Sequence, residues 1–298
     1  MKPGLAHCLA AAIFLSCAPG CNRTPLDNPA GAGRHKIITL APHITETVFA
    51  IGRGDRVVGV SSFCDYPPQV KDLPDVGGYV DPNLERIAVL EPELIILGGK
   101  HEKVAQYAGL RHIDILQVHM DSLATIYVGI ERIGEALDAA REAQSLCTEI
   151  KGELAGIKNA VQGLDRPAVL AITSRSRHDL NSLFTVGGTS FVSELIDTAG
   201  GHNIYRDADR PYIEASKETV VMEQPEVIIE FHAGENLSDR DRSNYVDDWR
   251  VLKSIPAVKN NRIHIITASH ALRPGPRIAE IAGLIAKCIH PDVKIPEQ

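Results

Sequence analysis

Two segments of this chain carry the same side chains in the same order. Tyr79 and Glu85 in "GYVDPNLERIAVLEPELIILGG" recur as Tyr212 and Glu218 in "PYIEASKETVVMEQPEVIIEF". Both pairs are separated by 133 residues, and each segment ends in an apolar run typical of a strand buried on both faces. Phenol and carboxylate groups bind ligands or partners through hydrogen bonds and charge. The constant offset therefore indicates two equivalent halves, each with its own copy of these groups.

Motifs for catalysis are absent from the sequence. It contains no H-E-x-x-H, G-x-S-x-G or Walker pattern. The segment "GRGDRVVG" (52–59) superficially resembles a nucleotide-binding loop, but it follows an expected helix and precedes an expected strand, the reverse of the required order. The histidines are scattered without metal-ligand spacing. These observations disfavour an enzyme and also a protein that binds bare metal ions, so we expect no catalytic residues and no resident metal or cofactor.

The charge distribution excludes another class of function. The 298 residues carry a net charge of −7, and the lysines and arginines are scattered among acids without a basic stripe. A protein that binds nucleic acid usually concentrates positive charge on one face. We therefore expect no nucleic-acid partner.

The elements that must position the repeated residues alternate between strand and helix. This alternation predicts an α/β fold in which mostly parallel sheets are covered by helices. The polar segment 234–248 is expected to be a solvated connection. The expected strands are 36–41, 56–61, 93–99, 113–118, 168–173, 182–188, 226–231 and 262–267, and the expected helices are 43–52, 83–90, 101–109, 190–201, 216–222 and 276–289.

The middle of the chain has a different pattern. Residues 122–164 contain no proline and consist mostly of helix formers. The second part of this segment predicts one helix of about 24 residues, roughly 36 Å long. We therefore expect an N-terminal lobe (36–137), a linking helix (138–163) and a C-terminal lobe (164–292). A cleft between two lobes is a favoured place for a small ligand.

The N-terminus has the features of an export signal. Lys2 precedes a short apolar run, and small residues follow it before Cys21. This arrangement resembles a bacterial lipoprotein signal with Cys21 as the lipidated residue, although Cys17 competes and simple cleavage or an uncleaved anchor is open. We expect a signal segment (1–21), a flexible tether (22–35) and an extracytoplasmic, lipid-anchored protein.

The other cysteines do not form a complete disulfide framework. Cys64, Cys147 and Cys288 are three in number and show no metal-ligand spacing. We expect isolated, buried thiols.

Several motifs in order resemble one known family. The segments "ITLAPHITETVFAIGRGDRVVGVSSFCDYPPQV", "LPDVGGYVDPNLERIAVLEPELII" and "FTVGGTSFVSELIDTAGGHNIY" are similar to the periplasmic metal-chelate binding proteins of ABC importers. The similarity covers about residues 36–290 and is greatest to members that bind cobalamin. It implies two α/β lobes joined by one rigid helix, a ligand between them, and a membrane permease with its ATPase as partners.

The resemblance also gives the repeated residues a role. In this family, a glutamate on the outer surface of each lobe binds arginines of the permease, and by motif these are Glu85 and Glu218. Charge-assisted Arg–carboxylate bonds at two separated points would fix the register of the complex. An alternative is that each glutamate only stabilises its helix, because acids near a helix N-terminus complement the helix dipole.

The family's ligand-binding positions match five further residues. They are Phe63, Tyr79, Tyr212, His270 and Arg273, with Arg175 and Arg177 as weaker candidates. Flat rings suit a corrin or porphyrin face, Arg273 suits an anionic group of the ligand, and neutral His270 suits a metal centre. The resemblance therefore implies a corrinoid ligand, with a ferric siderophore or haem as the alternative. Reuse of the lobes in a sensor or an adhesin is also open.

Overall fold

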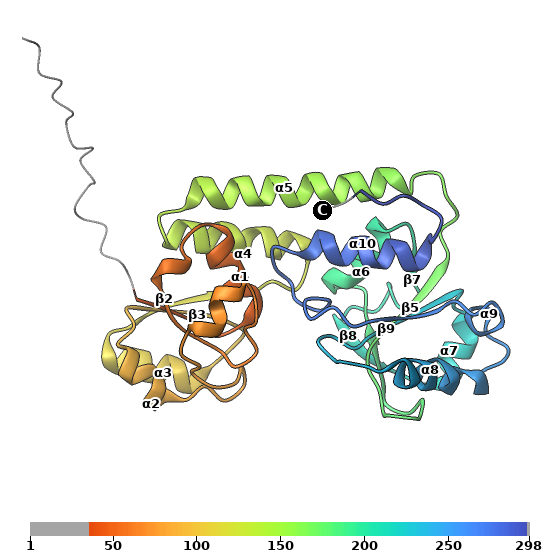
Figure 1. The fold of residues 1–298 in the computed structure, drawn as a ribbon, viewed down its shortest axis with the longest axis horizontal. Coiled ribbons are helices and arrows are strands. Elements are labelled where there is room, and N and C mark those ends of the chain that lie inside the picture. The colour runs from red at the N-terminus through yellow and green to blue at the C-terminus, as the bar shows by residue number, and fades with distance from the viewer. Residues whose placement is uncertain (1–35, 297–298) are drawn as a thin grey trace, which may run out of the picture. The chain divides into compact units, whose positions relative to one another are not determined.

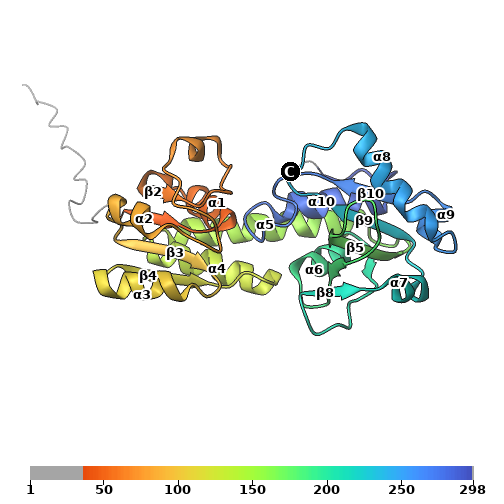
Figure 2. The ribbon, with the colours of Figure 1, turned by 90° about the horizontal axis from the view of Figure 1, so that it is seen from below.

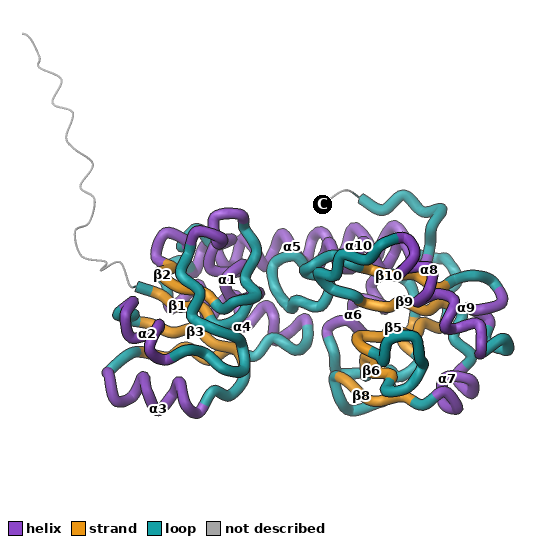
Figure 3. Tube along the Cα trace, turned by 60° about the horizontal axis from the view of Figure 1, so that its bottom comes forward, coloured by secondary structure: helices purple, strands orange, loops and turns teal. Residues whose placement is uncertain are grey.

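The computed structural model describes residues 36–296, which belong to one compact unit. The expected signal segment, the tether and Cys21 lie outside the described residues. Figures 1 and 3 show two sheets within this unit, each surrounded by its own helices. In the part of the chain that is described, no helix has the length and apolar character needed to cross a bilayer.

The sheet of the N-terminal lobe has four parallel strands in the order β2-β1-β3-β4. Ile37 and Ile96 face α1 and α4, whereas Ile38 and Ile95 face α2 and α3, because side chains alternate along a strand. Helices therefore cover both faces of the sheet. The elements are β1 (Ile37–Thr39), α1 (Pro42–Ala50), η1 (Gly54–Arg56), β2 (Val57–Val60), η2 (Pro68–Asp72), α2 (Leu84–Leu90), β3 (Leu94–Gly98), α3 (Glu102–Arg111), β4 (Asp114–Val118) and α4 (Leu123–Ala136).

The sheet of the C-terminal lobe has the order β10-β9-β5-β6-β8, and β7 also pairs with β5. The pairs β10–β9 and β9–β5 are parallel, while β6 is antiparallel to both of its neighbours. Ile229 packs in the cluster that includes α6 and α10, and Ile228 packs in the cluster around Trp249. The elements are β5 (Ala168–Ser174), β6 (Leu183–Val186), α6 (Phe191–Thr198), β7 (His202–Asn203), β8 (Tyr212–Ala215), α7 (Lys217–Glu223), β9 (Val227–Phe231), α8 (Asp239–Asp248), η3 (Trp249–Val251), α9 (Pro256–Lys259), β10 (Ile263–Ile266) and α10 (Ile278–Ile289).

Helix α5 (Ala140–Ala160) joins the two lobes. Its 21 residues correspond to about 32 Å. Ala143 packs against α4, where Gly134 allows the two helices to approach closely, while the distal part of α5 packs with α10 and α6. Figures 1 and 2 show α10 beside α5. The predicted fold class, two α/β lobes joined by one long helix, is confirmed, while the lobe limits 36–137 and 164–292 stay predictions.

The sequence repeat is also a structural repeat. Helix α7 follows α2 at an offset of 133 residues at both ends, and strand β9 follows β3 at the same offset. Ile87 and Val220 are the only buried residues of their helices. Both helices end in a left-handed residue, Glu91 (φ 48°) and Gln224 (φ 47°). Each lobe therefore builds the same helix–turn–strand unit.

Two expectations about the C-terminal lobe were wrong: that residues 234–248 form a solvated connection, and that Tyr212, like Tyr79, lies on the loop that enters the following helix. Residues 234–248 are not only a solvated connection, because α8 occupies most of this segment and buries Tyr245. A capping box formed by Ser238 and Asp241 starts the helix. Tyr212 begins strand β8 and does not lie in a loop, whereas Tyr79 does lie in the loop before α2.

Candidate functional site

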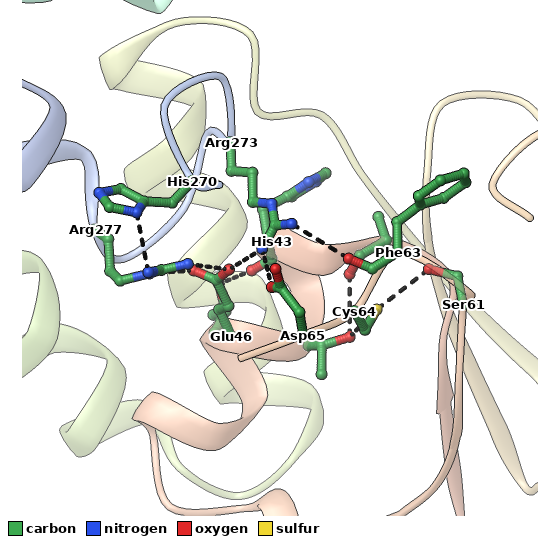
Figure 4. A network of polar contacts seen from close by, with 12 residues as sticks. His43, Glu46, Ser61, Phe63, Cys64, Asp65, His270, Arg273 and Arg277 are labelled. Carbon is green, nitrogen blue, oxygen red and sulfur yellow. Dashed lines mark hydrogen bonds and ion pairs between the residues drawn. The ribbon is translucent and has the colours of Figure 1, made fainter. Parts of the chain in front are cut away.

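A buried carboxylate joins the two lobes. Glu46 lies on α1, and its side chain is only 3% exposed. Arg273 Nη1 donates to Glu46 Oε1 at 3.1 Å, and Arg277 donates to both Glu46 oxygens, from Nη2 at 2.7 Å and from Nε at 2.9 Å. Both arginines come from the loop between β10 and α10 (Figure 4). The buried charge of Glu46 is thus compensated entirely by the other lobe.

The loop between β10 and α10 also forms hydrogen bonds with the segment that follows β2. Arg273 Nη1 also donates to the Asp65 carboxylate, and Arg273 Nη2 donates to the backbone oxygen of Phe63 at 3.3 Å. The ring of Phe63 is not covered, since the residue is 65% exposed. Arg273 therefore fixes the backbone that carries this aromatic ring, and two of the residues selected from the sequence are in direct contact.

His270 contacts two charged neighbours, Arg277 and Glu280. Arg277 Nη1 donates to His270 Nδ1 at 3.1 Å, and His270 Nε2 lies 3.2 Å from the Glu280 carboxylate without forming a hydrogen bond. Burial, followed by the charge of Arg277, lowers the pKa of His270 to about 4. The imidazole is therefore neutral near pH 7. Its predicted contact with a ligand metal stays a prediction.

His43, also on α1, lies next to the network of Glu46, Arg273 and Arg277 (Figure 4). Burial, with a smaller effect of Arg273, lowers the pKa of His43 to about 4. The backbone of Gly275 passes so close to His43 that a Cβ there would lie 3.1 Å from the His43 Cβ. A glycine at position 275 thus lets the loop from the second lobe rest on α1.

Tyr79 and Tyr212 are both affected by the charge of Asp121, in the segment between β4 and α4. Burial raises the pKa of both tyrosines, and the negative charge of Asp121 raises both further, while Ser190 opposes the shift at Tyr212. Asp121 precedes α4, and its backbone oxygen accepts a hydrogen bond from Phe191 N of the other lobe at 2.7 Å. The two tyrosines, one from each lobe, therefore share one electrostatic neighbour.

Tyr79 has further contacts in its own lobe. Its hydroxyl donates to the backbone oxygen of Gly98 at 3.1 Å, and its ring packs edge-on against His101 at a centroid distance of 5.0 Å. Gly98 ends β3, and ligands of α/β sheets are usually bound beyond the carboxyl ends of strands. Tyr79 therefore lies at the edge where such sheets usually bind ligands, and its contact with a ligand stays a prediction.

Glu85 and Glu218 occupy matching, exposed positions in the first turns of α2 and α7. The preceding caps also match, since Asn83 and Ser216 each accept hydrogen bonds from the first turn of their helix. A hydrogen bond from its own backbone N–H lowers the pKa of Glu218, which keeps this carboxylate charged. Among residues 36–296, neither Glu85 nor Glu218 forms a salt bridge.

Arg175 is a structural residue. Its side chain is buried, and it donates to the carboxylates of Glu230 and Asp248, both at 2.9 Å, and to the backbone oxygen of Tyr245 at 3.0 Å. Trp249 Nε1 donates to the same Glu230 carboxylate. The weaker suggestion that Arg175 contacts a ligand is not supported by this geometry, whereas Arg177 is exposed.

A cavity of about 630 Å³ lies beside the network that joins the lobes. Its lining includes Glu46, Phe49, Tyr66 and Arg277, and neither Tyr79 nor Tyr212 contributes to it. The guanidinium of Arg277 lies over the Tyr66 ring at 4.1 Å, a cation–π contact. The cavity therefore belongs to the junction of the lobes and not to the pair of tyrosines.

Metal ligands do not gather in the described part of the chain. Residues 36–296 contain no group of three or more His, Cys, Asp or Glu side chains placed to hold a metal ion. Cys64, Cys147 and Cys288 are free thiols. Cys147 is buried, while Cys64 and Cys288 are partly exposed.

Sequence motifs did not select Glu46, Asp65 or Arg277. One signal was present, because Glu46 interrupts the otherwise apolar and threonine-rich buried face of α1. A buried charge of this kind requires a partner. The partners lie more than 200 positions away in the sequence, so their identity could not be read from local spacing.

Comparisons with known proteins agree with this fold. A family model described as periplasmic binding protein matches residues 37–269. A vitamin B12-binding protein of Vibrio campbellii is 30% identical over 249 residues, which cover 81% of this chain and 84% of the relative.

Two solved structures have folds similar to that of this chain. The periplasmic vitamin B12-binding protein BtuF of Vibrio cholerae has a TM-score of 0.70 and 26% identity, covering 85% of this chain and 95% of that one. The periplasmic haem-binding protein RhuT of Roseiflexus sp. RS-1 has a TM-score of 0.71 and 26% identity, covering 86% and 98%.

Proposed function

Because the chain belongs to the periplasmic binding protein family, we propose that it is the substrate-binding protein of an ABC importer. It captures a corrinoid between its lobes and delivers this ligand to a membrane permease that works with an ATPase. The observation that carries the choice of ligand is the vitamin B12-binding relative, which is 30% identical over most of both chains.

The geometry of the two lobes supports this proposal. Phe63, Tyr79 and Tyr212 are partly or largely exposed aromatic residues contributed by both lobes. Aromatic faces bind a planar macrocycle through apolar burial and dispersion. The joining helix and the Glu46 network keep the lobes at a defined separation. A large, rigid, flat chelate is the kind of ligand that such a frame accommodates.

The test is an equilibrium titration of the purified protein with cyanocobalamin, a ferric siderophore and haemin, followed by absorbance. We expect saturable binding of the corrinoid. Tyr79→Ala and Tyr212→Ala should each weaken it by about tenfold or more, while Tyr107→Ala on α3 serves as a control outside the predicted site. Failure to bind the corrinoid at micromolar concentrations would refute this choice of ligand.

Haem or a ferric siderophore is the alternative ligand. A solved haem-binding protein resembles this chain as closely as the BtuF structure does. Tyrosine hydroxyls such as that of Tyr79 are suitable ligands for ferric iron. A shift of the haemin Soret band that disappears in Tyr79→Phe, without corrinoid binding, would favour this alternative.

The proposal includes a lipid anchor outside the described residues. Cys21 follows small residues and an apolar segment, the arrangement of a lipoprotein signal. Cys21→Ser should move the protein from the membrane fraction to the soluble fraction after cell lysis. Release by Cys17→Ser instead would assign the anchor to the competing cysteine.

A further inference from the structure

The repeated helices carry a second matching feature beside their glutamates. Val89 on α2 is 81% exposed, and Met222 on α7 is 79% exposed. These two residues are separated by the same 133 positions as the glutamates. Each lies four residues after Glu85 or Glu218, and positions i and i+4 share one face of a helix. Both lobes thus present a carboxylate and, about 6 Å further along the helix axis, a bare apolar side chain.

Exposed apolar residues are common when they occur singly. In the described residues, Leu110 on α3 is 76% exposed and Val251 in η3 is 71% exposed, and no partner is implied for either. Val89 and Met222 differ because the same combination, an acid and an exposed apolar side chain four residues later, occurs in both lobes at one register. The buried Ile87 and Val220 fix the same orientation of both helices relative to their lobes.

Two matching surfaces suit a partner with two matching subunits. A partner built from two copies of one chain presents each contact twice, related by a twofold axis. Each carboxylate suits an arginine of such a subunit. The apolar side chain beside it suits a dry recess, since the centre of an interface is depleted in charge and enriched in apolar contacts.

We propose that Val89 and Met222 are apolar docking contacts, each of which fills a recess beside the arginine on one of two identical permease subunits. The inference rests on the proposed transport function and adds a second contact to each lobe. The carboxylates set the register of the complex, and the apolar side chains contribute affinity that salt does not screen.

The experiment measures docking directly. Wild-type protein and the variants Val89→Ser, Met222→Ser and their double mutant are bound to the source organism's chelate permease–ATPase complex in lipid nanodiscs, by biolayer interferometry at low and high salt. We expect each single substitution to weaken docking by about tenfold and the double by about a hundredfold. Leu110→Ser and Val251→Ser are the matched controls, because they remove equally exposed side chains outside the repeat.

Further variants separate docking from folding. Val89→Leu and Met222→Leu should dock like the wild type, and every variant should keep the wild-type thermal midpoint and chelate titration. Docking of the double mutant within twofold of wild type, or an equal loss in the controls, would overturn the inference. Loss of chelate binding by the wild type itself would instead refute the proposed function.

Discussion

At the residue scale, Glu46 is the side chain that most directly couples the two lobes. Its carboxylate is buried between Arg273 and Arg277, and its nearest charges all come from the loop before α10. A charge in this position is stable only while its partners remain, because desolvation is costly for each ion. The importance of Glu46 therefore arises from the fold, which explains why local sequence motifs do not select it.

Replacing Glu46 should destabilise the protein. Glu46→Gln keeps the shape but leaves two guanidinium groups facing a neutral amide, so we expect a loss of about 3 kcal/mol in the free energy of unfolding. Urea denaturation followed by circular dichroism measures this change. The control is Glu85→Gln on exposed α2, which should stay within about 0.5 kcal/mol of wild type. Equal stability of both variants would show that the network contributes nothing net.

The buried histidines predict a pH dependence of stability. The pKa of His43 is lowered from 6.5 to about 4 by burial and by Arg273. In the unfolded chain this imidazole binds a proton below about pH 6.5, but in the folded chain it does so only below about pH 4. The unfolded state is therefore favoured progressively as the pH falls through this window, by up to about 1.4 kcal/mol per pH unit for this group.

Urea unfolding at several pH values between 4 and 7 tests this expectation. His43→Gln cannot bind the proton, so its free energy of unfolding should fall less steeply with decreasing pH than that of the wild type. The exposed His119 provides the control substitution, His119→Gln, which should keep the wild-type slope. A wild-type slope in His43→Gln would rule out this titration as a source of acid sensitivity.

At the element scale, periodicity predicted most of the helices and strands. The strands β3 and β9 are buried on every residue, as their continuous apolar runs indicate. Helix α8 was missed because nearly all of its side chains are polar, and its stability depends on Tyr245 and the capping box at Ser238. The short strand β8 was also missed, since its four residues give too short a pattern and its antiparallel pairing with β6 cannot be read from local sequence.

The contact between α4 and α5 gives a test at this scale. A Cβ on Gly134 would lie 2.3 Å from the Cβ of Ala143, so the helices can meet only if position 134 is glycine. We expect Gly134→Ala to lower the thermal midpoint, although alanine is the better helix former. Gly152→Ala in α5 is the matched control. Its Cβ would meet nothing within 4 Å, so this substitution should stabilise the protein by about 0.5–1 kcal/mol.

The thermal midpoints of Gly134→Ala and Gly152→Ala are measured by differential scanning calorimetry. A decrease in the first and an increase in the second would support close packing of α4 on α5. Stabilisation by both substitutions would mean that the helices can separate without cost. In that case α5 would not hold the N-terminal lobe at a fixed position, and the rigid frame assumed for ligand capture would be wrong.

At the scale of the whole molecule, the repeat relates two lobes that differ in most other respects. One sheet is entirely parallel with four strands, and the other has six strands with antiparallel pairs. The helix–turn–strand unit is nevertheless kept in both, with a side-chain N-cap at the same position and one buried residue at the same position of each helix. Folding alone does not require identical exposed groups on two different lobes. A common partner would explain why the surface, and not only the core, is repeated.

The repeated glutamates Glu85 and Glu218 provide the corresponding prediction. Glu85→Ala combined with Glu218→Ala should abolish uptake of the labelled chelate in cells, while the affinity of the purified protein for the chelate stays within about threefold of wild type. The affinity should be kept because these carboxylates lie in exposed first turns of α2 and α7, away from the Glu46 network. Glu102→Ala combined with Glu149→Ala removes two other exposed helix glutamates, on α3 and α5, and should leave uptake intact. An unchanged transport rate in the first double mutant would show that the repeated glutamates serve only their helices.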